Sequence, residues 1–267
     1  MIVGLPMYAL PELTAATRDW WQGLRRHFMR AGIAEVPEQL TEPGDLARHW
    51  LAPDLLFTQT CGYPLTHALS GKVQLVATPC FDAVGCNGPT YCSVVVTRDG
   101  EDIDSLADLR GKRVAYNGTD SQSGYNTLRH LVAPMAEAGR FFAAGIETGA
   151  HRRSLAAVRN GEAEVASLDC VSLALIERVA PDELRGIRKL CLTTPAPSLP
   201  YITSKATPAE TLERLRDGLR AAVADPHLQA TRSMLLLTDI VVLPLEAYDS
   251  ILSMEREAAV AGYPRLD

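Results

Sequence analysis

The segment from Asp120 to Tyr125 carries the residues whose types and spacing best fit a chemical role, because it reads Asp-Ser-Gln-Ser-Gly-Tyr. It lies between an apolar strand predicted at 112–116 and a helix predicted from about 126 to 135. A helix start has free backbone N–H groups and a partial positive charge, and two serine hydroxyls with a glycine there form a compact cup for an anion's oxygens. We predict an oxyanion-binding site formed by Ser121, Gln122, Ser123 and Gly124.

The alternative for this segment is an ordinary helix N-cap, since serine and aspartate are preferred cap residues of any helix. A cap needs one such residue, whereas Asp120, Ser121 and Ser123 exceed that need, so we favour the anion site. The carboxylate of Asp120 would repel an anion, and we expect it to point away from the site.

Two candidates for the same site follow later in the chain. His151 opens a helix predicted at 151–160, where a ring nitrogen could donate to an anion, although a lone histidine is often a surface or cap residue. Asp169 ends an apolar strand predicted at 163–168, where a carboxylate must be hydrogen-bonded or paired. Asp169 could either lie in the ligand pocket or cap the helix predicted at 171–179.

The first part of the chain supplies further candidate ligand contacts. Tyr8 directly follows the strand predicted at 2–7, and we favour it as a ligand contact over a core aromatic residue. Thr58 and Thr60 end a short apolar run, although β-branched hydroxyl residues occur in any strand. Tyr63 is a further aromatic candidate, with a core ring and a satisfied hydroxyl as its alternative.

Catalytic motifs are missing from the sequence. There is no Gly-x-Ser-x-Gly elbow around the serines, no Gly-x-x-x-x-Gly-Lys-Ser/Thr phosphate loop and no His-Glu-x-x-His pair. The remaining histidines are scattered without the spacing of metal ligands. We therefore expect a binding protein with no catalytic residue, no cofactor and no metal site.

Composition limits the partners. The chain has 267 residues, of which 47% are hydrophobic and 22% charged, so it can bury the core of one large domain or of two lobes. A net charge of -6 gives no basic field, which argues against nucleic acid and anionic membranes as partners. No segment has the roughly 18 uninterrupted apolar residues of a membrane span, so we expect no membrane insertion.

The cysteines and the N-terminus bear on the cellular compartment. The six cysteines include no Cys-x-x-Cys pair, and we expect buried free thiols, with a Cys80–Cys86 or Cys86–Cys92 bridge as the alternative. Residues 1–8 show no basic stretch followed by an apolar core, so they are typical of a first strand and not of a signal peptide. The expected location is cytoplasmic as the sequence is written, and periplasmic if a leader was removed.

Strands alternate with helices along the chain, which predicts an α/β fold of mostly parallel sheets flanked by helices. Three prolines within residues 193–200 indicate a stiff extended crossing between two lobes, and everything after it has a helical pattern. We predict a discontinuous first lobe, 1–93 plus 195–267, and a second lobe, 94–194. Ligands of such sheets bind beyond the carboxyl ends of strands, and a cleft between two lobes collects several of these ends.

Several motifs occur in the order known from one protein family. They are Pro6-Met7-Tyr8, Tyr91-x-Ser93 before a Val-Val-Val-Thr-Arg strand, Ser105-Leu106-Ala107-Asp108-Leu109-Arg110-Gly111-Lys112, Ser121-x-Ser123-Gly124, Gly149-x-His151-x-x-Ser154 and Asn160-Gly161-x-Ala163-x-Val165-Ala166-x-x-Asp169. Together they resemble the phosphonate/phosphate-binding family of ABC-importer substrate-binding proteins over most of residues 1–205.

The resemblance implies a type II periplasmic-binding-protein fold, in which two α/β lobes joined by two hinge crossings close on a ligand. The crossings would lie near 92–94 and 193–199. Ser121, Ser123 and Gly124 would hold phosphonate or phosphate oxygens, Tyr8 would approach from the opposite lobe, and His151 would add a donor. Asp169 matches an acidic position near the amine end of aminophosphonates. Gln122 departs from the family pattern, which often has a hydroxyl residue there.

Residues and resemblance together predict a solute-binding protein that captures a small phosphonate-, phosphate- or phosphite-like oxyanion in an interlobe cleft by hinge closure, for an ABC importer and its permease. One alternative is a cytosolic enzyme of cofactor biosynthesis on the same fold, with Cys61, His67 and Cys86 near the cleft. The other is a ligand sensor, which would require a sizeable exposed apolar patch.

Overall fold

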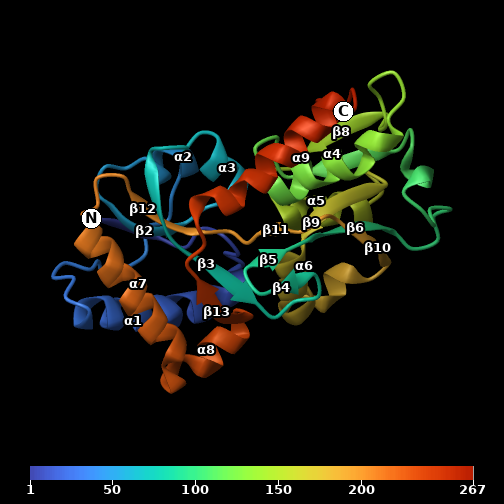
Figure 1. Ribbon diagram of the computed structural model, residues 1–267. Coiled ribbons are helices and arrows are strands. Elements are labelled where there is room, and N and C mark those ends of the chain that lie inside the picture. Colours follow the sequence, from blue (N-terminus) through green and yellow to red (C-terminus); the bar gives the residue numbers. More distant parts are fainter. Residues whose placement is uncertain (267) are drawn as a thin grey trace. The chain divides into compact units, whose positions relative to one another are not determined.

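The computed structural model describes residues 1–266, which form two compact units (Figure 1). Unit 1 comprises Met1–Asp82, Asn87–Pro89 and Pro197–Ala247. Unit 2 comprises Ala83–Cys86, Thr90–Ala196 and the chain from Tyr248 onward. Each unit has its own sheet flanked by helices, which confirms the predicted two-lobed α/β class. The sheets are mixed, however, and not mostly parallel as predicted, because β12 and β13 in unit 1 and β6 and β10 in unit 2 pair antiparallel with their neighbours.

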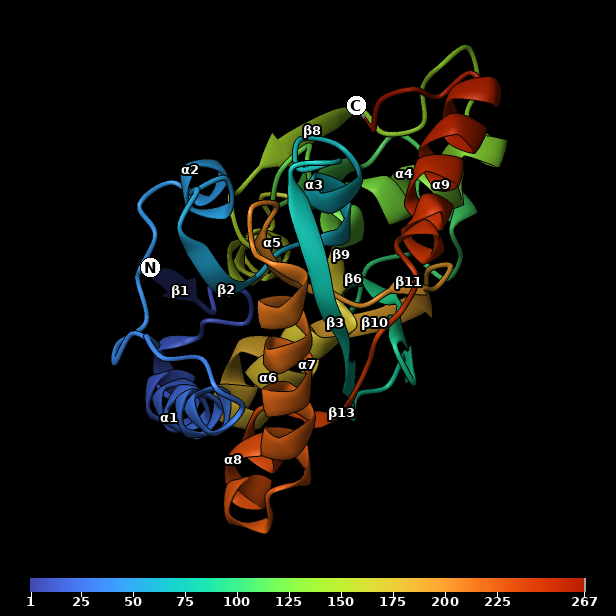
Figure 2. The ribbon, with the colours of Figure 1, turned by 60° about the vertical axis from the view of Figure 1, so that its left-hand side comes forward.

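The sheet of unit 1 has the strand order β1-β2-β12-β3-β13. Strands β1, β2 and β3 run in one direction, whereas β12 and β13 run against them. The long helices α1 and α7 lie side by side (Figure 2), and apolar residues such as Trp21 and Leu24 of α1 are fully buried. The strands are β1 (Ile2–Gly4), β2 (Leu55–Gln59), β3 (Val73–Phe81), β12 (Tyr201–Ser204) and β13 (Leu237–Val241). The helices are η1 (Pro11–Leu13), α1 (Thr14–Arg30), α2 (Leu46–Trp50), α3 (Gly62–Thr66), α7 (Ala209–Ala224), η6 (Pro226–Leu228) and α8 (Gln229–Met234).

Strands β12 and β13 correct the expectation that the chain is helical after the proline-rich crossing. They are too short to show a clear alternation of polar and apolar residues, so their sequences do not separate them from loops. Their conformation depends on neighbours that are distant in sequence. Strand β12 completes the hydrogen bonds of β2 and β3, and β13 completes those of β3.

The sheet of unit 2 has the strand order β10-β6-β9-β7-β8. Strand β7 pairs in parallel with β9 on one side and β8 on the other, and β6 pairs antiparallel with β9 and β10. The strands are β6 (Ser93–Arg98), β7 (Arg113–Tyr116), β8 (Ala144–Glu147), β9 (Val165–Asp169) and β10 (Ile187–Leu192). The helices are η2 (Ala107–Leu109), the π-helical turn η3 (Gln122–Asn126), α4 (Thr127–Val132), η4 (Ala133–Met135), α5 (His151–Arg159), α6 (Cys170–Val179), η5 (Pro181–Leu184) and α9 (Asp249–Val260).

The C-terminal part of the chain belongs to unit 2, whereas we expected 195–267 to lie in the first lobe. Helix α9 packs on α4 because polar groups of the two segments pair: Asn126 Nδ2 donates to the Ile251 carbonyl at 3.1 Å, and Arg129 lies 3.3 Å from Glu255. Arg129 also donates to the carbonyl of Pro264. The chain therefore enters unit 2 again within η7 (Leu245–Tyr248), a passage that was not predicted.

The second predicted crossing, near 193–199, contains an observed change of unit, whereas the first, near 92–94, lies a few residues after the observed changes. The chain changes unit between residues 82 and 90, and again between Ala196 and Pro197. Short strands occupy these places: β4 (Cys86–Asn87), β5 (Thr90–Tyr91) and β11 (Ala196–Pro197). Among the helices of residues 1–266, none has both the length and the apolar character needed to cross a bilayer.

Candidate functional site

Three parallel strands of unit 2 lead directly into the predicted site residues. Strand β7 is followed by the turn that holds Ser121 and Ser123, β8 is followed by His151, and β9 ends at Asp169. Because β7 lies between β8 and β9, the carboxyl ends of all three meet at one edge of the sheet. The sequence predicted that Ser121 and Asp169 follow strand ends, and the structure shows that these strands, together with β8, are neighbours in the sheet.

The serine-rich turn starts the helix with a side-chain cap. The Ser121 hydroxyl accepts a hydrogen bond from the Gly124 N–H at 3.0 Å, and the π-helical turn that follows continues into α4. A Cβ atom at Gly124 would lie 1.8 Å from Asn117 Oδ1, so this close approach requires glycine. This confirms the capping alternative for Ser121. The other N–H groups of the first turn still lack helical partners, and their role in anion binding stays a prediction.

Ser123 joins the turn to the helix after β8. Its hydroxyl oxygen lies 2.9 Å from Nε2 of His151, the first residue of α5. The carbonyl of Ser123 accepts hydrogen bonds from Ser167 on β9 at 2.7 Å and from Thr127 at 3.0 Å. Ser123 is therefore held at a fixed place between two helix starts.

His151 is a neutral donor or acceptor at physiological pH. Burial lowers the pKa of His151 to about 4, and an interaction with the backbone of Ser167 offsets only part of this shift. Helix α5 has Ala150 as its N-cap residue, with no side chain bonded to its first N–H groups. A neutral imidazole and these N–H groups are together suited to the oxygens of an anion.

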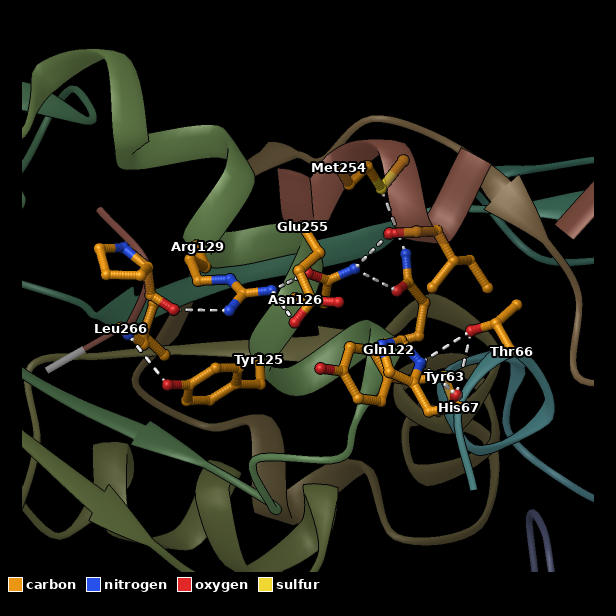
Figure 3. Close-up of polar contacts among 12 residues, drawn as sticks. Tyr63, Thr66, His67, Gln122, Tyr125, Asn126, Arg129, Met254, Glu255 and Leu266 are labelled. Atoms are coloured by element: carbon orange, nitrogen blue, oxygen red, sulfur yellow. Dashed lines mark hydrogen bonds and ion pairs between the residues drawn. The ribbon is translucent and has the colours of Figure 1, made fainter. Parts of the chain in front are cut away.

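The side chain of Gln122 points into the core of unit 2. Its Nε2 donates to the sulfur of Met254 at 3.2 Å, and its Oε1 accepts from Asn126 at 2.8 Å (Figure 3). The residue is fully buried. Only the backbone N–H of Gln122 therefore remains at the helix start, where we predicted a ligand contact.

Asp169 caps helix α6. Its Oδ1 accepts hydrogen bonds from the N–H groups of Val171 and Ser172, at 2.8 and 2.9 Å. This confirms the capping alternative for a buried acid at a strand end, while a role in ligand binding stays a prediction. Arg152, which follows His151 in α5, is bound to Glu183 at 2.7 Å.

Most of the unit-2 candidates are nearly closed to solvent in this structure, whereas His151 is only partly buried. The exposed fraction is 5% for Ser121, 3% for Ser123 and 1% for Asp169, whereas Asp120 is exposed. The two serines are therefore largely shielded from solvent. Burial also raises the strength of any hydrogen bond to an anion that does reach them.

The unit-1 candidates follow the neighbouring parallel strands β1 and β2. Tyr8 has a backbone φ of 61°, which is unfavourable for a residue with a side chain, and its ring packs edge-on against Phe81 at 5.2 Å. Such strained residues cluster at functional sites. Tyr63 lies in α3, with its ring stacked on His67 at a centroid distance of 3.8 Å.

The two threonines of unit 1 are fully buried. The Thr58 hydroxyl is 2.9 Å from Nε2 of His49, and burial lowers the pKa of this histidine. The Thr60 N–H donates to the Pro200 carbonyl at 3.0 Å. Sequence reasoning missed His49, because no spacing pattern connects it to Thr58.

Other features of the described residues lie apart from these candidates. No group of three or more His, Cys, Asp or Glu side chains in residues 1–266 is arranged to hold a metal ion. A cavity of about 270 Å³ in unit 2 has mainly apolar walls from β6, α6 and β10, and its lining includes none of the predicted site residues.

The chain matches one family model. The model describes a periplasmic substrate-binding protein of phosphonate ABC transporters, and it matches residues 52–241, more than half of the chain. No curated protein sequence matches the chain.

Solved structures match over nearly the whole chain. A binding protein component of an ABC phosphonate transporter from Pseudomonas aeruginosa aligns with a TM-score of 0.77 at 15% identity, covering 100% of this chain and 90% of that one. PhnD1 from Prochlorococcus marinus in complex with methylphosphonate aligns with a TM-score of 0.76 at 12% identity, covering 97% and 98%. XAC2383 from Xanthomonas citri bound to ATP aligns with a TM-score of 0.71 at 16% identity, covering 98% and 97%. At these low sequence identities, the TM-scores show that the chain shares the fold of these proteins.

Proposed function

Because this chain belongs to the family of periplasmic substrate-binding proteins of phosphonate ABC transporters, we propose that it binds a small phosphorus oxyanion through residues 121–124 and His151. The family consists of transport binding proteins and not of enzymes, so the alternative of a cofactor-biosynthesis enzyme is not retained. The ligand class is a tetrahedral phosphonate, phosphate or phosphite.

The observation that carries this proposal is the pair formed by Ser123 and His151, whose polar atoms lie 2.9 Å apart. The pair sits where two helices begin beyond the adjacent parallel strands β7 and β8, so backbone N–H groups of both helices point toward the same edge. All of these donors are uncharged. They recognise an anion by the direction of their hydrogen bonds and do not require a basic side chain.

We propose that binding is coupled to a conformational opening, because Ser123 is only 3% exposed. The closed arrangement excludes water from the donors, and hydrogen bonds to the bound anion gain strength in such surroundings. We propose that ligand entry and release follow an opening that exposes the turn, and that the ligand favours the closed state.

Unit 1 is proposed to add a donor through the hydroxyl of Tyr8, whose strained backbone fits a functional position. The cellular role that we propose is delivery of the anion to the permease of an ABC importer from the periplasm. Methylphosphonate is a suitable probe, since PhnD1 of the same fold was solved in complex with it.

Isothermal titration calorimetry with methylphosphonate, phosphate, phosphite and sulfate tests the proposal. We expect binding of at least one phosphorus oxyanion and a loss of affinity in Ser123→Ala of roughly ten- to a hundredfold, since a hydrogen bond to a charged group is worth roughly 1.5–3 kcal/mol. Ser70→Ala is the matched control, because Ser70 is an exposed serine of unit 1. A folded protein that binds none of the phosphorus oxyanions would exclude this ligand class. Equal affinities of Ser123→Ala and Ser70→Ala would exclude Ser123 as part of the binding site.

A further inference from the structure

Two cysteines of unit 2 lie in sulfur–sulfur contact. The Sγ atoms of Cys86 and Cys170 are 3.5 Å apart, although the residues are 84 positions apart in the sequence. Cys86 starts β4 in the short segment 83–86, and Cys170 is the first residue of α6, directly after Asp169. A disulfide has a sulfur–sulfur distance of roughly 2.05 Å, so a movement of roughly 1.5 Å would bring these atoms to bonding distance.

The backbone holds the two cysteines in this position. Gly85 has a φ of 103°, and a Cβ atom there would lie 3.3 Å from Cys170 Cβ and 3.4 Å from its Sγ, so the approach of segment 83–86 to α6 favours glycine. The backbone of Cys92 connects both sides. Its N–H donates to the Gly85 carbonyl at 2.8 Å, and its carbonyl accepts from the Cys170 N–H at 3.2 Å. Main-chain hydrogen bonds therefore hold the segments that carry the two cysteines together.

We propose that Cys86 and Cys170 form a disulfide when the protein meets a disulfide oxidant. Each thiol loses one proton and the pair gives up two electrons as the Sγ–Sγ bond forms, while the oxidant's own disulfide is reduced to two thiols. The reaction proceeds through a mixed disulfide between one protein sulfur and the oxidant. The second protein sulfur then displaces the reduced half of the oxidant. The periplasm to which the family description refers is a compartment where disulfides form and persist.

Cys86 is the sulfur that attacks the oxidant first. It is half-buried, whereas Cys170 is only 2% exposed. The hydrogen bond with Cys86, burial and the adjacent carboxylate of Asp169 all raise the pKa of the Cys170 thiol, which keeps that thiol protonated and poorly nucleophilic.

Cys92 is the competing partner for Cys86. Burial and the proximity of Cys86 raise the pKa of the Cys92 thiol. The structure favours Cys170 over Cys92, because the sulfur contact with Cys86 is made by Cys170. The sequence offered a Cys86–Cys92 bridge as an alternative, so the test must tell these two pairings apart.

The bridge would fasten segment 83–86 to the start of α6. This segment leads directly into the point where the chain leaves unit 2 at Asn87, and Cys170 follows the strand end that carries Asp169. A covalent link there restricts the unfolded chain over a long loop, so oxidised protein should melt at a higher temperature than reduced protein. The inference does not depend on the identity of the ligand.

The experiment treats the full chain with oxidised glutathione or with dithiothreitol, counts free thiols under denaturing conditions and maps the cross-linked peptides by mass spectrometry. We expect oxidation to remove two of the six thiols, to yield a peptide pair that joins Cys86 to Cys170, and to raise the melting temperature. Oxidation of the Cys86→Ser protein or of the Cys170→Ser protein should remove no pair of thiols. Cys191→Ser is the matched control, since Cys191 lines the same cavity as Cys170, and it should lose two thiols like the wild type.

Three outcomes would overturn the proposal: retention of all six thiols, a mapped bridge between other cysteines, or glutathione adducts on Cys86 without an internal bridge. Peptide mapping of the wild-type protein needs no variant, so a failure of either serine variant to fold does not affect the result.

Discussion

The hydroxyl oxygen of Ser123 lies 2.9 Å from Nε2 of His151, which joins the turn after β7 to the helix after β8. Since burial lowers the pKa of His151 to about 4, this is a hydrogen bond between two uncharged groups at neutral pH. Its direction can reverse with the histidine tautomer, so the Ser123 proton is available either to the imidazole or to a bound anion.

The two residues of this pair should be energetically coupled in ligand binding. We expect His151→Ala to weaken methylphosphonate affinity by about tenfold or more, because the loss of the imidazole leaves Ser123 without its partner. The double variant Ser123→Ala/His151→Ala should cost less than the sum of the single variants. Calorimetry on the wild type, the two single variants and the double variant gives the coupling free energy between the two residues. His227→Ala is the control, because His227 is an exposed histidine. Strictly additive costs would contradict a shared role.

Gly124 should be irreplaceable in the serine-rich turn. The Cβ atom of Gly124→Ala would lie 1.8 Å from Asn117 Oδ1 and 3.3 Å from the Asn117 backbone nitrogen. We expect this variant to lose about 1–3 kcal/mol of unfolding free energy and to lose ligand binding. Gly44→Ala is the control, since nothing lies within 4 Å of its added atom. Urea unfolding and calorimetry measure both effects, and a Gly124→Ala protein as stable as the control would contradict the crowding.

Gln122 should contribute to stability more than to affinity. Gln122→Met has a similar volume but removes the amide that bonds Asn126 and Met254, leaving buried polar groups with fewer partners. We expect a loss of about 1–3 kcal/mol in unfolding free energy with the ligand affinity of the folded protein nearly unchanged. Ser123→Ala should instead lower the ligand affinity more than the unfolding free energy. Urea unfolding and calorimetry on both variants decide this, and a large affinity loss in Gln122→Met would place its amide at the ligand.

The protein should become less stable as the pH falls below neutral. The pKa of His151 is about 4 in the folded protein and 6.5 in the unfolded chain, so the unfolded state binds more protons between these values. The contribution of His151 to the unfolding free energy is fully present above pH 6.5 and is lost as the pH falls toward 4. The total loss is at most about 3 kcal/mol. Buried His49, whose pKa is also lowered, acts in the same direction.

The contribution of His151 can be separated by a variant. His151→Gln keeps a hydrogen-bonding side chain but does not titrate, so its unfolding free energy should fall less between pH 7.5 and 5 than that of the wild type. The contribution of His49 is common to both proteins. Urea unfolding at the two pH values measures the difference, and identical pH dependence would show that His151 is not held neutral.

The hydroxyl of Tyr8 should take part in ligand binding. We expect Tyr8→Phe to weaken methylphosphonate binding by about tenfold, since one hydrogen bond to a charged group is lost while the ring contact with Phe81 is kept. Tyr63→Phe tests the second tyrosine of unit 1 in the same way. Affinities equal to the wild type in both variants would show that these hydroxyls do not reach the anion.

The order of strands and helices near the site was readable from the sequence. Apolar runs such as that of β7 and the cap residues that follow them are local signals, because a strand end and a helix start each depend on a few neighbouring residues. The prediction that Ser121 and Asp169 follow strand ends therefore needed no tertiary information, whereas β8 before His151 was not predicted. The family resemblance followed from the same local motifs.

Only the tertiary structure decided where side chains point and which distant segments meet. Gln122 turns toward Met254, which is 132 residues away, and Thr58 is engaged by His49. The placement of α9 on unit 2 depends on Arg129 and Glu255, and the contact of Cys86 with Cys170 depends on the backbone of Cys92. Partners distant in sequence set these orientations, because a buried polar or sulfur atom takes whichever neighbour the packed chain brings within a few ångströms.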